Sequence, residues 1–219
     1  MLNALSSALL GFLLGLKHAT DADHVVAVTT IVARERSFGR AARIGALWGL
    51  GHSLTVILIG GGLIAFRLTM PPRVGLGLEF CVALMLIVLG FSNLRPESRD
   101  GSHRHSLAAG GPLRPLVIGV VHGLAGSAAV ALLVLAVIPE PAWALAYLLV
   151  FCVGTVAGMV VVTALLAAPA VFAADRVVRF QHGIRLAAGV LSLVVGVVLA
   201  REVIVSGGLF GDAVHWTPH

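Results

Sequence analysis

Six long apolar runs limit what this chain can fold into more than any other feature of its sequence. A helix needs about 20 mostly apolar residues to cross the hydrocarbon core of a bilayer. The runs that reach this length are Leu2–Ala33, Ile44–Phe66, Val74–Leu94, Leu113–Ile138, Ala142–Ala168 and Ile184–Val205. The connectors between them are too short for a separate soluble domain. We therefore predict an all-α membrane protein with six transmembrane helices in a single domain over residues 1–219.

The composition excludes several other classes of protein. Only 11% of the residues are charged, whereas a soluble domain carries roughly 25%. This deficit excludes a water-soluble globule, a disordered chain and an independent nucleic-acid binder. The two cysteines, Cys81 and Cys152, lie inside apolar runs and define no disulfide framework. No secretory cleavage pattern accompanies the first run, so we expect that run to be retained.

The arginines are divided unequally between the two ends of the predicted spans. One side receives eleven of them, Arg34, Arg36, Arg40, Arg43, Arg95, Arg99, Arg104, Arg114, Arg176, Arg179 and Arg185. The other side receives Arg67, Arg73 and Arg201. Because Lys and Arg concentrate in cytoplasmic loops, the arginine-rich side should face the cytoplasm. This predicts a multi-pass protein of the cytoplasmic (inner) membrane with both termini outside, and it explains the net charge of +5.

The two halves of the chain resemble each other faintly at near-constant offsets of 103 to 106 residues. The matched segments are Gly15–His18 with Gly119–His122, Leu50–His52 with Val153–Thr155, and Leu89–Arg95 with Val195–Arg201. A repeated unit of three spans inserts with opposite topology the second time, which is a transporter arrangement. We predict inverted repeats over about 1–95 and 113–205, a cytoplasmic linker over 96–112 and an extracytoplasmic tail over 206–219.

A cluster of charged and polar residues, Lys17–His24, interrupts the first apolar run. One Asp or Lys at the centre of a spanning helix costs about 2.5–3.5 kcal/mol, so these side chains need a partner, water or an ion. The alternative is a turn outside the membrane between two short segments. On an unbroken helix at about 100° per residue, Asp21 lies between His18 and His24, and Asp23 points elsewhere. Asp23 then either orients His24 or joins the cluster because the helix loosens there.

The second run brings a third histidine, His52, followed by Ser53. A lone histidine in a span is often a helix–helix hydrogen-bonding residue. His52 and His24, however, lie at similar depths from the same end of consecutive helices, which usually pack antiparallel, so the two should be neighbours. Imidazole suits nickel, cobalt, copper and zinc. The residues therefore predict a divalent transition-metal site in which Lys17 neutralises a carboxylate when no ion is bound.

These motifs are similar to those of the nickel/cobalt transporter family. His18, four residues, Asp23 and His24 form its H-x4-D-H signature, and Leu50–Val56 resembles its second signature. The resemblance implies uptake of nickel or cobalt, with His18, Asp23 and His24 selecting the metal and His52 nearby. Members with eight spans carry later acidic motifs that have no counterpart in this chain, and Arg is usual at the position of Lys17. The chain looks closer to six-span members classed as urease accessory nickel permeases.

The metal-ligand candidates are therefore His18, Asp21, Asp23, His24 and His52, with secondary candidates His122, Lys17 and Ser53. His122 is the repeat partner of His18, and a structural hydrogen bond is the alternative role for it. Glu79 in the third span is expected to meet water or an arginine, and His103 and His105 are expected to be solvated.

No enzymatic role is predicted, because the chain lacks the H-E-x-x-H motif of metalloproteases and a G-x-S-x-G elbow. It also lacks a phosphate loop for ATP, so the membrane potential would drive uptake. The metal ion is cargo, and no resident cofactor is expected. Efflux is the first alternative, and a membrane-embedded metalloenzyme is the second. A cytoplasmic metallochaperone is a candidate partner, and the oligomeric state is open.

Overall fold

The computed structural model describes residues 4–32, 35, 37–95, 113–124, 138, 140–172, 178–211 and 213–216. The described residues form helices and no strand, which confirms the all-α prediction. The labelled helices are α1 (Ala4–His18), α2 (Ala22–Val32), α3 (Phe38–Thr55), η1 (Val56–Gly60), α4 (Gly61–Phe66), α5 (Pro72–Leu94), α7 (Pro141–Phe172), α8 (Val178–Arg201) and η3 (Glu202–Ser206). A further helix without a label spans Arg114–Leu124.

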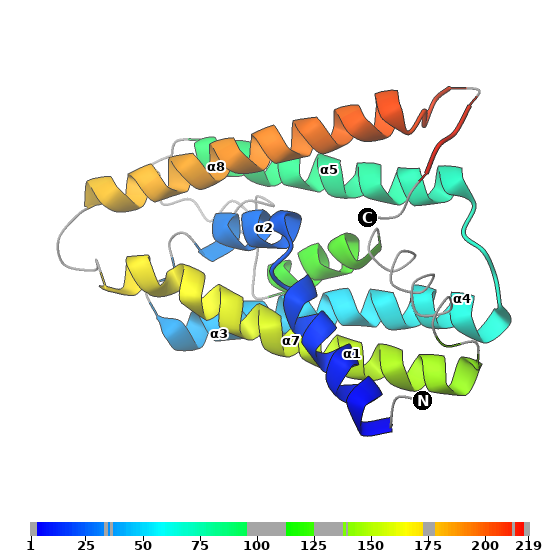
Figure 1. The fold of residues 1–219 in the computed structure, drawn as a ribbon. Coiled ribbons are helices and arrows are strands. Elements are labelled where there is room, and N and C mark those ends of the chain that lie inside the picture. The colour runs from blue at the N-terminus through cyan, green and yellow to red at the C-terminus, as the bar shows by residue number, and fades with distance from the viewer. Residues whose placement is uncertain are drawn as a thin grey trace.

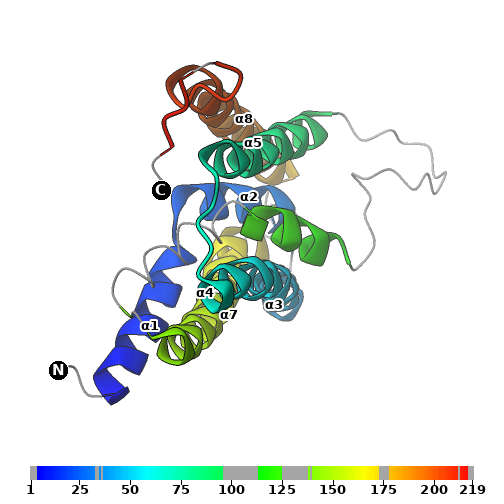
Figure 2. The same cartoon turned by 90° about the vertical axis from the view of Figure 1, so that its right-hand side faces the viewer.

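The helices form two layers with two short helices between them. Helices α5 and α8 run side by side in one layer, and α3 with α4 and α7 make the other (Figure 1). Helix α2 and the helix Arg114–Leu124 lie between these layers, while α1 crosses α7 obliquely (Figures 1 and 2). Because α2 is enclosed from both sides, His24 in its first turn is buried in the interior of the molecule.

Four described helices are long and apolar enough to cross a membrane by length and composition. They span Phe38–Phe66, Pro72–Leu94, Pro141–Pro169 and Gly183–Ser206. They coincide with four of the six expected spans. The second part of the fourth expected span, residues 125–137, lies outside the described residues, as does the expected linker 96–112 with His103 and His105. The count of six spans and the inverted repeats stay predictions.

The first expected span is not one continuous helix. Helix α1 ends at His18 and α2 begins at Ala22. The hydroxyl of Thr20 donates to the carbonyl oxygen of Lys17 at 2.6 Å, and the Asp21 N–H donates to the carbonyl oxygen of His18 at 3.1 Å. Such local bonds compete with the i→i−4 pattern of a helix, so the polar segment turns instead of continuing. The expectation from an unbroken helix was therefore wrong, and the loosening that the sequence left open occurs.

Matching glycines hold the two halves of the chain together at equivalent places. A Cβ added to Gly51 of α3 would overlap the carbonyl oxygen of Leu116, and one added to Gly154 of α7 would overlap the carbonyl oxygen of Phe12. Gly51 and Gly154 are 103 residues apart, and Phe12 and Leu116 are 104 apart. Helix α1 therefore packs on α7 of the other half, and the helix Arg114–Leu124 packs on α3. In both contacts a glycine lets the two backbones approach closely.

Helices α5 and α8 repeat this reciprocity with each other. A Cβ at Gly90 would meet Leu193 at 2.8 Å, and a Cβ at Gly196 would meet Ile87 at 2.8 Å. Both glycines and both partners are 106 residues apart. The contact between the two helices is therefore nearly the same when viewed from either one.

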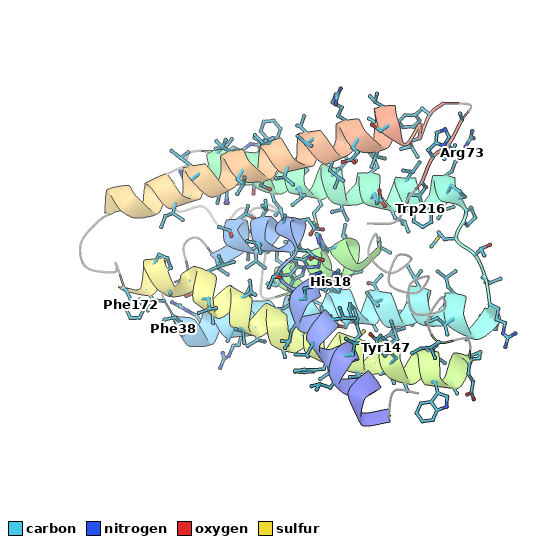
Figure 3. All side chains as sticks on the ribbon, in the orientation of Figure 1. His18, Phe38, Arg73, Tyr147, Phe172 and Trp216 are labelled. Atoms are coloured by element: carbon cyan, nitrogen blue, oxygen red, sulfur yellow. The ribbon has the colours of Figure 1, made fainter. Side chains whose placement is uncertain are left out.

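The C-terminal segment after η3 folds back along the start of α5. The N–H of His215 donates to the carbonyl oxygen of Gly207 at 3.0 Å, and the Arg73 guanidinium donates to the carbonyl oxygen of Gly211 at 3.1 Å. The indole N–H of Trp216 donates to Glu79 Oε1 at 2.9 Å. Arg73 and Trp216 accordingly lie at the same end of α5 in Figure 3. Glu79 is thus in contact with the C-terminal segment, which the sequence did not predict.

Candidate metal site

Four elements each deliver a histidine to the centre of the molecule. His18 is the last residue of α1, His24 lies in the first turn of α2, and His52 lies near the end of α3. His122 comes from the helix Arg114–Leu124. His24, His52 and His122 are each no more than 2% exposed, and His18 stands where α1 meets α2 (Figure 3). The structure therefore brings His18, His24 and His52 together, and their role as metal ligands stays a prediction.

The rings of the three predicted histidines face one another. The centroid of His18 lies 4.5 Å from that of His24 and 5.2 Å from that of His52, and the last two are 5.1 Å apart. His18 Nε2 and His52 Nε2 are 3.2 Å apart. Two nitrogens bound to one tetrahedral ion at about 2.1 Å lie about 3.4 Å from each other. The observed separation is thus close to what a shared metal ion requires.

Each of the two aspartates orients an imidazole. His18 Nδ1–H donates to Asp21 Oδ2 at 2.8 Å, and His24 Nδ1–H donates to Asp23 Oδ1 at 3.0 Å. A bond of this kind fixes the tautomer of the ring and leaves the lone pair on Nε2, where a metal can bind. Both histidines are therefore held in the protonation pattern of a metal ligand, with Nε2 available.

Asp23 also reaches a histidine that the sequence ranked only second. Its Oδ2 accepts from His122 Nε2 at 3.0 Å, while its Oδ1 also accepts the backbone N–H of His24 at 2.9 Å. The carboxylate thus bridges two elements that are 98 residues apart in sequence. The rings of His24 and His122 lie edge to face, with centroids 4.3 Å apart. His122 belongs to the cluster, and its repeat relation to His18 was the signal for it.

Buried nitrogens in the cluster have no hydrogen-bond partner among the described residues. They are His24 Nε2, His52 Nδ1, His122 Nδ1 and Trp48 Nε1. Leaving a buried polar atom unpaired costs about 1–3 kcal/mol, and native interiors contain few such atoms. Trp48 can only donate, but the three imidazole nitrogens can accept a proton or a metal ion. These buried, unpaired acceptors are what a ligand site would supply.

Two groups of three side chains satisfy the distance requirement of a metal site. His18, His24 and His52 form one, and Asp23, His24 and His122 form the other. Within each group the ligand atoms lie within 4.8 Å of one another. The groups share His24, so they lie next to each other. Nitrogen with a single carboxylate is a donor set of borderline character that suits nickel, cobalt, copper and zinc.

The remaining candidates lie at the edge of the cluster or outside it. Asp21 is exposed, and within the described part of the chain its carboxylate contacts the cluster through His18. The Lys17 side chain is exposed. Ser53 is buried and its hydroxyl donates to the carbonyl oxygen of Cys152 at 3.4 Å, which joins α3 to α7. Trp48 and Phe151, which were not among the candidates, pack on the rings of His24 and His18 with centroids 5.6 and 5.4 Å away.

A cavity of about 530 Å³ opens onto the cluster. Its wall includes His18, His24 and His122 on one side and residues of α5 and of the α8–η3 region on the other. An ion could therefore approach the histidines from the space between α2 and the α5–α8 layer. Glu79 and Glu202 also line this cavity. The sequence offered no spacing or motif that would have connected Glu202 with the histidines.

Comparison with known proteins places these residues in a family. Residues 4–94 match the family NicO, described as high-affinity nickel-transport protein. The chain is 36% identical to the urease accessory protein UreH of Bacillus sp. (strain TB-90) over 219 aligned residues, which cover 94% of this chain and 95% of that protein. It is 37% identical to the high-affinity nickel transport protein of Cupriavidus necator over 70 residues, covering 32% of this chain and 20% of that protein. No solved structure matches the chain.

Proposed function

Because the chain belongs to the nickel-transport family and aligns with nearly the full length of UreH, we propose that it is a permease that takes up Ni²⁺ through the cytoplasmic membrane. The observation that carries this proposal is the buried convergence of four histidines from four elements, with two Nε2 atoms 3.2 Å apart. The protein is a transporter rather than an enzyme, so the nickel ion is its cargo.

The surface of the helices suits a lipid environment. Large apolar side chains point away from the interior on each of the long helices, among them Leu58, Val88, Leu165 and Val197, which are 67%, 59%, 66% and 53% exposed. The protein is therefore a multi-pass membrane protein, and its polar groups gather at the centre. A divalent ion that crosses inward gains about 4.6 kcal/mol per 100 mV, which supplies a driving force without ATP.

Nickel binds first, in this proposal, to His18, His24 and His52. Asp21 orients the ring of His18 and Asp23 orients the ring of His24, which leaves Nε2 of each available to the ion. Asp23, His24 and His122 form the second position, and His24 is the ligand common to both. An ion that keeps His24 can exchange the remaining ligands one at a time, so it need never be released into the apolar interior. Lys17 and Ser53 stand outside this ligand set. Lys17 balances the nearby carboxylates, and Ser53 secures α3 against α7.

The proposed path needs an inverted repeat, with α1 and α2 together as the first of six spans. The reciprocal glycine contacts between the halves support it, because equivalent helices pack on one another in equivalent ways. The break at Ala19–Asp21 supports it as well, since transporter sites are typically formed by interrupted helices near the midplane. Rocking one repeat against the other would expose the histidines to each side in turn.

The orientation we propose puts the arginine-rich helix ends in the cytoplasm and both termini outside. Cobalt is a second proposed cargo, because imidazole ligands suit both ions. A cytoplasmic metallochaperone is the proposed acceptor, and the oligomeric state does not enter the mechanism.

Uptake of radioactive nickel by cells expressing the full chain tests the proposal. The wild type should accumulate nickel, and His24→Ala should not, because both ligand groups lose a member. His219→Ala, at the last position of the chain, serves as the matched control and should behave as the wild type. Depletion of cellular nickel on expression would instead indicate efflux, and equal uptake by wild type and His24→Ala would overturn the assignment of the site.

A further inference from the structure

The cavity beside the histidines carries an unusual share of the chain's acidic groups. Four carboxylates line it: Asp21 and Asp23 on the α2 side, Glu79 from α5 and Glu202 from η3. The chain has ten acidic residues in all. No lysine or arginine of the described segments lines this cavity. The lining is therefore electronegative on two opposite walls, which raises the local concentration of cations.

Glu79 and Glu202 also line a second, smaller cavity. This cavity has a volume of about 170 Å³ and extends from the two glutamates to His215 and Trp216 of the C-terminal segment. Leu199 is a third residue common to both cavities. The two glutamates consequently stand at the junction between the space that reaches the histidines and the space that reaches the end of the chain.

The inner end of the larger cavity is built for a ligand. His24 and His122 line it, and each is only 2% exposed. His24 Nε2 and His122 Nδ1 have no hydrogen-bond partner among the described residues. These buried acceptors are independent of the glutamates, and they can bind a cation that enters this cavity. Glu79 and Glu202 line the outer end of the same cavity, where a cation would pass before it reaches the histidines.

We propose that Glu79 and Glu202 form a second cation site, an outer vestibule that holds the hydrated divalent ion before it reaches the histidines. This inference rests on the proposed transport function. Carboxylate oxygens bind hydrated divalent ions without stripping all their water, whereas the imidazoles behind them bind transition metals directly. The vestibule gathers divalent cations with little discrimination, and the histidine cluster selects among them.

Trp216 is hydrogen-bonded to one of the two vestibule glutamates. Its indole N–H donates to Glu79 Oε1, and its ring packs against the backbone at Gly75, where a side chain would collide with it. An arriving cation exchanges for this neutral donor at the carboxylate. The C-terminal segment therefore holds Glu79 at the junction of the two cavities.

Manganese binding tests the vestibule separately from transport. Mn²⁺ prefers oxygen ligands, and its electron paramagnetic resonance signal reports the free ion in a titration of the full chain in lipid nanodiscs. We expect the double variant Glu79→Gln, Glu202→Gln to bind Mn²⁺ about tenfold more weakly than the wild type. The variant His24→Ala, which we expect to abolish nickel uptake, should keep this binding. Glu140→Gln is the matched control, because Glu140 is an exposed carboxylate that lines neither cavity.

Nickel uptake supplies the second readout. The double variant should show a KM for nickel raised about tenfold with little change in the rate at saturation, and Glu79→Asp with Glu202→Asp should restore the wild-type KM. Unchanged Mn²⁺ affinity in the double variant, or an equal loss in Glu140→Gln, would overturn the vestibule and leave the histidine site untouched. If the double variant does not insert into the membrane, the same measurements are made on the single variant Glu202→Gln. Glu202 is exposed, so its replacement should leave the fold intact.

Discussion

The two halves of the molecule pack alike but carry different chemistry. Helix α1 and the helix Arg114–Leu124 occupy equivalent positions, each lying at backbone distance on the long helix of the other half. In the first half the chain then continues through Asp21, Asp23 and His24, whereas the equivalent positions of the second half are Ala125, Ser127 and Ala128. Among the described residues, the second half contributes one histidine, His122, to the cluster. A symmetric scaffold thus holds an asymmetric site, so packing and metal binding can be perturbed separately.

Substitution of the reciprocal glycines should have the largest effect, and it should be the same in both halves. Gly51→Ala and Gly154→Ala each drive a Cβ into a backbone carbonyl, and overpacking of this kind typically costs about 1–3 kcal/mol or more. Both variants should lower the melting temperature in detergent and reduce the amount of folded protein in the membrane. Gly62→Ala, where no atom lies within 4 Å of the added carbon, should melt like the wild type. A strong effect in only one half would contradict the equivalence of the two contacts.

Replacing the histidine common to both ligand groups should come next, with the fold retained. His24→Ala should bind Ni²⁺ at least about 100-fold more weakly in equilibrium dialysis, a factor that corresponds to about 2.7 kcal/mol. Its melting temperature in the absence of metal should change much less than that of the glycine variants. Nickel affinity within a factor of about two of the wild type would remove His24 from the site.

The two aspartates should differ, although both contact a histidine. Asp23→Asn affects His24 and His122 together and should weaken nickel binding about 10–100-fold, the usual range for groups that orient metal ligands. Asp21→Asn affects only His18 from an exposed position and should stay nearer the lower end of that range. Isothermal titration of the two variants side by side gives the comparison. A larger loss in Asp21→Asn would reverse the roles that we assign.

The smallest effect is expected at Lys17, which lies next to His18 in sequence but is exposed and does not line the cavity. Lys17→Gln should change the KM for nickel uptake by less than about twofold, because exposed charges interact weakly. A tenfold change would show that this ammonium group reaches the ion path.

The long helices could be predicted because the length of an apolar run is a strong signal. The four long helices fall where the hydropathy of the sequence predicts them. The break at Ala19–Asp21 was harder to predict, because the argument from 100° per residue assumes that the helix continues. That assumption assigned Asp21 to the centre of the face and Asp23 to another direction. In the structure Asp23 is the residue that joins two histidines.

The candidate site could also be predicted only in part, because the sequence does not show which distant helices meet. Three histidines could be brought together from neighbouring helices in sequence, because their depth in the membrane can be counted from the apolar runs. His122 and Glu202 come from elements far away in sequence, and nothing in a helical period tells which face of a distant helix will meet the site. Only the repeat relation to His18 pointed to His122, and Glu202 had no comparable partner.

A crystal or electron-microscopy structure of the full chain prepared with saturating nickel, with the metal identified by anomalous scattering or by its density, tests the central claim most directly. Our account predicts one Ni²⁺ bound at about 2.1 Å to imidazole nitrogens of His18, His24 and His52, or to the adjoining group that shares His24. Nickel found elsewhere in the protein, with these imidazoles still paired only to each other and to the aspartates, would contradict it.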